Sequence, residues 1–178
     1  DAEQKVIAAK AEADAIRQKA EAEAELNNAK VEEVTDVNGL KAVKITFDSG
    51  LLFNTSSAEL NSASKANLDK LAKLMKKYST CLIDAYGHTD NQGWRNATAE
   101  ESVQKNLQLS QERAQSVADY LKACGVSASQ FKNVVGKGSS EPVADNSTAA
   151  GMQQNRRVEV FLYASEQMVK EAQQGKLN

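Results

Sequence analysis

Hydrophobic periodicity switches repeatedly between the period of a strand and that of a helix from Leu40 to Tyr163. Residues 40–47 alternate apolar and polar side chains, and residues 157–163 do the same, which predicts a strand at each place. Two helices and two more strands are predicted between them, over 63–78, about 98–124, 81–86 and 131–135. The order strand, helix, strand, helix, strand, loop, strand favours an α/β (α+β) fold with helices packed on one face of a sheet.

The predicted helices have recognisable start and stop signals. Asn61 or Ser62 is suited to cap the first helix. Thr98 and Glu101 have the spacing of a capping box, and Gly125 has the position of a helix-terminating glycine.

The first 34 residues have a different composition, with no glycine or proline and many helix-forming residues. Apolar residues in this segment follow one another at spacings of three and four, namely Val6, Ala9, Ala13, Ile16 and Ala20. The next positions of this apolar seam are the polar Glu23 and Asn27, which argues against a coiled coil. We therefore expect a solvated single helix or spacer, about 50 Å long if fully helical.

Turn-forming residues at 35–39 separate this segment from the rest of the chain. The sequence thus predicts a helical stalk over 1–38, a folded domain over 39–164 and a tail over 165–178, with a short helix at 165–174.

Composition excludes several classes of protein. The 178 residues include 22 Lys and Arg against 24 Asp and Glu, so a broad basic face for nucleic acid is not expected. One His and two Cys without a C-x-x-C spacing do not make a zinc finger, and no metal or other cofactor is predicted. No apolar run reaches the length of a membrane span. The start at Asp1, without a signal peptide, suggests a processed form or an expressed fragment.

Polar residues that follow the second strand are the main candidates for a ligand site, because ligands bind beyond the carboxyl ends of strands in open sheets. Asp90 there provides an anion, and Arg113 on the following helix provides a forked cation. Two interpretations are open. The pair binds a ligand that carries both an ammonium and a carboxylate, or it forms an internal salt bridge that holds the helix.

Several motifs, in this order, resemble the OmpA C-terminal-like domain, the family of the periplasmic domains of OmpA, Pal and MotB. They are Gly87-His-Thr-Asp90-x-x-Gly93, Asn106-x-x-Leu109-Ser110-x-x-Arg113-Ala114, Gly136-x-Gly138-x-x-x-Pro142 and Asn155-Arg156-Arg157-Val158-Glu159. The resemblance runs from about Ile45 to Tyr163. It implies a βαβαββ sandwich with helices on one face of a mixed sheet, here preceded by an N-terminal helix.

The resemblance also implies a function, which is noncatalytic binding of peptidoglycan through the diaminopimelate residue of its stem peptide. Asp90 would receive the ammonium and Arg113 the carboxylate of that residue. Asn106 matches a position that hydrogen-bonds the peptide, and Thr89 and Leu107 match neighbours in the same pocket. Asn155 and Arg157 match positions that are structural or orient the ligand.

The same resemblance implies a location in a Gram-negative periplasm. The stalk would connect the domain to an outer-membrane anchor that precedes Asp1. A lipid anchor, as in a lipoprotein, and a barrel are both open.

Two departures from the family pattern concern the rim of the pocket. The stretch from Trp94 to Lys105 lengthens the connection before the helix. Two roles are open for Trp94, which either covers the ligand or packs on this longer loop, and packing is favoured. Met152 stands where an arginine is common, which removes one cation.

Cys81 and Cys124 lie at the start of a strand and at the end of the helix that returns beside it. Both ends come to the same edge of the sheet, so a disulfide is geometrically feasible, and an oxidising periplasm would permit it. A pair of free thiols is the equal alternative.

Two other functions compete with wall binding. A wall hydrolase needs an activated nucleophile, a metal or a carboxylate pair; no G-x-S-x-G is present, and His88 is interpreted as structural. A structural protein that forms a homodimer through the N-terminal helix is the second alternative.

Overall fold

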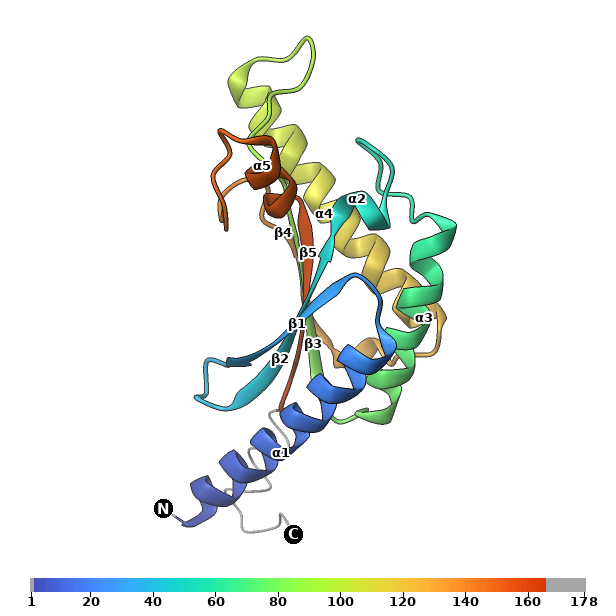
Figure 1. The fold of residues 1–178 in the computed structure, drawn as a ribbon, viewed down its shortest axis with the longest axis vertical. Helices are drawn as coiled ribbons and strands as arrows, with labels where there is room; N and C mark the ends of the chain where they lie inside the picture. The colour runs from blue at the N-terminus through green and yellow to red at the C-terminus, as the bar shows by residue number, and fades with distance from the viewer. Residues whose placement is uncertain (1, 166–178) are drawn as a thin grey trace.

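The computed structural model describes residues 2–165, which form a five-stranded mixed sheet with helices on one face (Figure 1). The strands are β1 (Ala29–Thr35), β2 (Lys41–Asp48), β3 (Leu82–His88), β4 (Phe131–Gly136) and β5 (Arg157–Tyr163). Their order across the sheet is β1-β2-β5-β3-β4. Only β3 and β4 run parallel, and every other neighbouring pair is antiparallel. The expected fold class is confirmed.

The three long helices are α1 (Ala2–Glu25), α3 (Ser62–Lys77) and α4 (Ala99–Ala123). All three contribute to one hydrophobic core with β2, β3 and β5, and they lie on the same side of the sheet (Figure 1). The largest buried side chains of this core include Phe53, Ile45, Leu68, Leu121 and Leu162. The shorter helical segments are α2 (Ser49–Leu52), α5 (Ala149–Asn155) and the 3₁₀ turn η1 (Ala128–Gln130).

The capping signals read from the sequence are confirmed. Asn61 accepts a hydrogen bond from the Ser64 backbone N–H at the start of α3. Thr98 and Glu101 form both hydrogen bonds of the capping box at the start of α4. Gly125 follows α4 with a φ of +102°, in the left-handed region that glycine adopts without strain.

The prediction of a single helix over residues 1–34 is wrong in its second part. The helix ends at Glu25, and Ala29–Thr35 form the edge strand β1, paired with β2 through a hairpin. Asn28, with a φ of 55°, lies between the end of the helix and the start of this strand. The turn at residues 35–39 is therefore the hairpin turn, and its Asn38-Gly39 pair is a typical hairpin signal.

The expected solvated character of α1 is also wrong, because one face of the helix is buried. That face comprises Ile7, Ala11, Ala15, Gln18 and Ala22. The seam proposed from the sequence points the other way, since Val6 and Ile16 on it are about half exposed. The small alanine side chains let the helix approach β1, β2 and α3 closely. Hydrophobicity alone underestimates how readily such an alanine face is buried. The predicted helix at 165–174 lies, apart from Ser165, outside the described residues.

The structure has both cysteines as free thiols, so the disulfide alternative is not realised. Cys81 lies under α1, where its Sγ accepts a hydrogen bond from Gln18 at 3.6 Å. Cys124 points towards α3, and its Sγ contacts an Asp69 oxygen at 3.4 Å. The two sulfurs thus face different helices, although strand and helix end at the same edge of the sheet.

Replacement of Ala15 with Leu tests the packing of α1. Ala15 is 1% exposed in the core, so we expect overpacking to lower the free energy of unfolding by about 1–3 kcal/mol. The matched change Ala20→Leu lies on the exposed side of the helix and should stay within about 0.5 kcal/mol of the parent. Urea denaturation measures both, and equal effects would contradict the packing of α1 on the sheet.

Thiol titration tests the free cysteines. Unfolded protein prepared without reductant should give two thiols per chain. In the folded protein the half-buried Cys124 should react before the buried Cys81, because it is more accessible. Burial raises the pKa of both thiols, and it raises that of Cys81 to about 11, which leaves little thiolate there. A count of zero after unfolding would show that the two form a disulfide.

Candidate functional site

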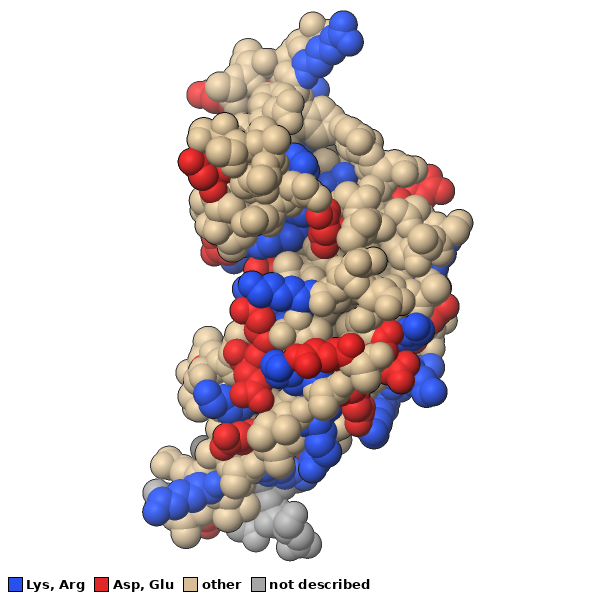
Figure 2. All heavy atoms as spheres, in the orientation of Figure 1, with Lys and Arg blue, Asp and Glu red and all other residues tan. Residues whose placement is uncertain are grey.

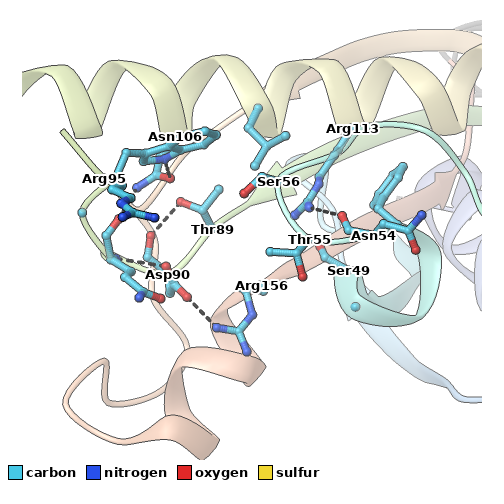
Figure 3. Close-up of a pocket in the computed structure, with 16 residues that line it drawn as sticks. Ser49, Asn54, Thr55, Ser56, Thr89, Asp90, Arg95, Asn106, Arg113 and Arg156 are labelled. Carbon is cyan, nitrogen blue, oxygen red and sulfur yellow. Dashed lines mark hydrogen bonds and ion pairs between the residues drawn. The ribbon is translucent and has the colours of Figure 1, made fainter. Parts of the chain in front are cut away.

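An open pocket of about 710 Å³ lies where the loop after β3, the first half of α4, the α2 region and the end of α5 meet (Figure 3). Polar and charged side chains from all four parts converge on it. Its lining comprises Ser49, Gly50, Phe53, Asn54, Thr55, Ser56, Thr89, Asp90, Gln92, Gly93, Trp94, Arg95, Asn106, Leu109, Arg113 and Arg156. Figure 2 shows basic side chains in the hollow between α2 and α5.

Two glycines place α4 against the end of the sheet that carries the pocket. A Cβ on Gly87 of β3 would lie 2.1 Å from the Ser110 carbonyl oxygen, and one on Gly136 of β4 would lie 2.2 Å from the Gln111 nitrogen. Any larger residue would therefore push the helix away from the strands. The close approach sets the distance between the α4 side chains and the loop that follows β3.

Asp90 is the only acidic residue of the pocket lining, and it is 6% exposed. Its Oδ1 accepts a hydrogen bond from the Gln92 backbone N–H at 3.0 Å. Its Oδ2 pairs with Arg156 Nη1 at 2.6 Å. The internal salt bridge that the sequence left open between Asp90 and Arg113 is therefore not formed.

Arg113 is 5% exposed and has no carboxylate partner among the described residues. Its Nε donates to the Ser57 carbonyl at 2.8 Å and its Nη2 to the Asn54 carbonyl at 3.3 Å. The guanidinium also stacks over the Phe53 ring, 5.1 Å from its centroid. Burial, and then the charge of Arg156, lower the pKa of Arg113 from its ordinary value, and Asp90 opposes this. The result is a fixed, buried cation that an anion would stabilise.

Asn106 lines the pocket, but both ends of its amide already have partners. Its Nδ2 donates to the Gln92 carbonyl at 3.2 Å, and its Oδ1 accepts from Trp94 Nε1 at 2.7 Å. Lys105 lies over the Trp94 ring. Trp94 therefore packs on the first turns of α4 rather than on the loop, because the helix already begins at Ala99. Trp94 also lines the pocket, so its contact with a ligand stays a prediction, and Asn106 holds the loop in place.

Leu107 does not line the pocket. Asn106, Leu109 and Arg113 are spaced i, i+3 and i+7 on one face of α4, and Leu107 lies off that face, 40% exposed. Thr89, in contrast, lines the pocket beside Asp90 and donates its hydroxyl to the Asp90 carbonyl.

Asn155 is fully buried outside the pocket and organises the loop before β5. Its Oδ1 accepts from the backbone N–H groups of Val143 and Ala144, and its Nδ2 donates to the Ala144 carbonyl and to Asn146. All of these hydrogen bonds are made within the protein. Of the two roles that the family resemblance implied, structural or ligand-orienting, they favour the structural one.

Arg157 is also outside the pocket lining, in a buried polar cluster on the other face of the sheet. Its Nε donates to Glu159 Oε2 at 3.0 Å. His88 Nε2 and Lys44 Nζ each lie 3.0 Å from a Glu159 oxygen. Burial by itself would raise the pKa of Glu159, but these three hydrogen bonds outweigh it and hold the pKa well below its usual range. His88 is thus structural, as expected.

Sequence reasoning missed Arg156, Arg95 and the polar segment 49–56 as parts of the pocket. Arg156 is the neighbour of the arginine that was chosen, and adjacent residues at the start of a strand point to opposite faces. The serines, asparagine and threonine of 49–56 follow the first predicted strand, one of three places where polar residues concentrate, but none of them is among the predicted site residues. Among residues 2–165, no group of three His, Cys, Asp or Glu side chains is placed to hold a metal ion, and no helix there is long and apolar enough to cross a membrane.

The fold and the pocket motifs agree with the comparisons with known proteins. The model of the OmpA family matches residues 52–156, and the chain belongs to this family. It is 37% identical to the probable lipoprotein YiaD of Escherichia coli over 118 residues, 66% of this chain and 50% of that protein. It is 34% identical to the peptidoglycan-binding protein ArfA of Mycobacterium tuberculosis over 121 residues, 68% of this chain and 34% of that protein.

A solved structure supports the same assignment. The cell wall anchor of the T6SS from Pseudomonas aeruginosa has a TM-score of 0.64 and 31% identity, and the match covers 89% of this chain and 97% of that one. The chain therefore has the architecture of an OmpA-like domain, while it spans half or less of the two relatives named above.

Replacement of Glu159 with Gln tests the structural cluster. We expect a loss of about 3 kcal/mol in the free energy of unfolding at pH 7, because Arg157 is left buried without its counter-ion. The lowered pKa of Glu159 contributes stability above the pKa of the unfolded state, and this contribution is lost as the pH falls. The difference from the parent should therefore narrow below about pH 4.

Denaturation at pH 7 and pH 3 measures this effect. The control Glu32→Gln removes a surface carboxylate 3.8 Å from Lys30 and should cost less than about 1 kcal/mol at either pH. A Glu159→Gln deficit that does not change with pH would contradict the role of the ionised carboxylate.

Proposed function

We propose that this chain binds peptidoglycan noncovalently, through the diaminopimelate-type residue of the stem peptide. The observation that carries the proposal is Arg113, a buried guanidinium held by two backbone carbonyls, with no carboxylate partner among the described residues, in the same pocket as Asp90. A carboxylate next to an ammonium on one tetrahedral carbon complements such a pair of charges.

In this proposal Arg113 binds the ligand carboxylate through guanidinium N–H groups that its two backbone bonds leave free. The ammonium binds Asp90, which Arg156 occupies at Oδ2 when no ligand is present. Arg156 is 38% exposed at its side chain, so it has room to share the carboxylate or to turn towards solvent when the ammonium arrives. The wider pocket, about 710 Å³, has the size of a small-ligand site.

The affinity expected for one stem peptide is modest. Each charge-assisted hydrogen bond contributes about 1.5–3 kcal/mol, and the ammonium competes with Arg156 for Asp90. A polymer that repeats the same stem raises the overall attachment through many simultaneous contacts. This suits a reversible tether to a cell wall.

Membership of the OmpA family supports this proposal. One relative is named a peptidoglycan-binding protein, and one similar structure is that of a cell wall anchor. YiaD is named a probable lipoprotein. We accordingly propose a periplasmic location, with an outer-membrane anchor of the lipoprotein or barrel type on the longer protein.

We propose that the binding is noncatalytic. The pocket lining holds one carboxylate, so it lacks the pair that glycoside hydrolysis uses. None of the three proteins named above is named as an enzyme.

No observation favours the alternative of a homodimer through the N-terminal helix. The apolar face of α1 is buried within its own chain, and its exposed large apolar side chains among the described residues are Val6 and Ile16.

Binding to purified sacculi tests the proposal. Asp90→Asn and Arg113→Lys should each weaken co-sedimentation with sacculi at least tenfold, because the first removes the charge that pairs with the ammonium and the second removes the forked donor for the carboxylate. Arg113→Lys keeps the positive charge and loses the fork, which separates carboxylate recognition from simple attraction. The same incubations should release no soluble muropeptides.

Asp119→Asn is the matched control, because Asp119 is exposed on the same helix and lies outside the pocket lining. Thermal unfolding confirms that each variant is folded. A folded Asp90 or Arg113 variant that binds like the parent would show that the proposed binding by Asp90 and Arg113 is wrong, and released muropeptides would indicate a hydrolase.

A further inference from the structure

We infer that Arg95 is a specificity-determining residue, which binds a second carboxylate of the ligand in addition to the one held by Arg113. The inference rests on the proposed function and deepens it. It states that the pocket selects a stem peptide whose carboxylates are free over one whose carboxylates are amidated.

The balance of charge in the pocket is the first argument. Its lining contains three cations and one anion, namely Arg95, Arg113, Arg156 and Asp90. Asp90 and Arg156 pair directly at 2.6 Å, so their charges offset each other. Arg113 and Arg95 remain without a carboxylate partner among residues 2–165. A ligand with one ammonium and one carboxylate adds no net charge and leaves this excess in place.

The placement of Arg95 is the second argument. Arg95 lies on the lengthened loop next to Trp94, and Trp94 is held from two sides. Its backbone N–H donates to Ser102 Oγ at 2.8 Å, and its Nε1 donates to Asn106 Oδ1 at 2.7 Å. The Ala97 N–H closes a turn onto the Trp94 carbonyl at 3.3 Å.

Arg95 therefore lines the pocket from an anchored loop, with its side chain exposed. Figure 3 shows Arg95 on the loop side of the pocket and Arg113 further along α4. The two unpaired guanidinium groups thus lie at different ends of one pocket. A ligand with carboxylates at two separate positions could therefore contact both cations.

The chemistry of a stem peptide supplies the second carboxylate. Besides the zwitterionic carbon of diaminopimelate, the tripeptide L-alanyl-γ-D-glutamyl-meso-diaminopimelate carries the α-carboxylate of D-glutamate and its own terminal carboxylate. A planar guanidinium binds either with two parallel hydrogen bonds. Arg95 is exposed, so solvent screens its interaction and the expected gain is moderate.

Calorimetric titration of the full chain with three tripeptides tests the inference. The first has all carboxylates free, the second has the D-glutamate α-carboxylate as an amide, and the third has the terminal carboxylate as an amide. We expect one of the two amides to bind the parent about fivefold more weakly than the free acid. In Arg95→Gln that amide and the free acid should bind equally, and the free acid should lose about the same factor.

Lys73→Gln is the matched control, because it removes one positive charge from an exposed position on α3 outside the pocket. It should keep the preference of the parent for the free acid. Raising the salt concentration should reduce the preference of the parent, as expected for an exposed ion pair.

The outcomes separate the inference from the proposed function. One outcome would contradict the role of Arg95 alone. In it the parent binds the free acid and both amides equally well, while Asp90→Asn abolishes binding. The proposed binding by Asp90 and Arg113 would then still hold. The same conclusion follows if a folded Arg95→Gln variant keeps the preference. If the free acid does not bind the parent at all, both the inference and the proposed function are wrong.

Discussion

The close contact between α4 and the ends of β3 and β4 is the constraint on which the site depends. Gly87 and Gly136 have no Cβ, and the backbone of α4 at Ser110 and Gln111 fills the space that a Cβ would need. Asp90 follows β3 and Arg113 lies on α4, so this contact fixes one relative to the other. The capping box at Thr98 fixes where the helix begins, and therefore which of its residues face the pocket. Packing of backbone against backbone thus determines the geometry of the charges.

The polar clusters around Glu159 and around Arg113 differ in how their buried charges are compensated. Around Glu159 the carboxylate has three donors, so its charge is compensated and the cluster stabilises the sheet. Within this cluster His88 Nδ1 is buried without a hydrogen-bond partner among the described residues. In the pocket, Arg113 has carbonyl partners but no counter-ion among the described residues. Its charge is kept in position by groups that do not neutralise it, which preorganises the site for an anion. The adjacent arginines 156 and 157 divide between these clusters, because consecutive residues at the start of β5 face opposite sides of the sheet.

Much of the central sheet and of α3 and α4 could be predicted, because their hydrophobic periods and caps are local signals. The error over residues 26–35 has a local cause too, since Glu, Lys and Ala are common in helices and only the pairing with β2 stabilises a strand there. The buried face of α1 was missed because alanines carry little hydrophobic signal, while Val6 and Ile16 carry more and point outwards. In the site, Thr89, Asp90, Asn106 and Arg113 come together as predicted, whereas Leu107, Asn155 and Arg157 do not.

The sequence by itself determined the fold class, the family and the two charges at the centre of the pocket, because these depend on periodicity and on motif spacing. Only the tertiary structure decided how the charges are paired. In the structure Asp90 pairs with Arg156, and Arg113 has no carboxylate partner among the described residues. Arg95, on the lengthened loop, lines the pocket. Both ends of the Asn106 amide form hydrogen bonds with that loop. The physical reason is that hydrogen-bond partners are chosen by proximity in space among several candidates of the same type, and proximity of segments distant in sequence is set by packing.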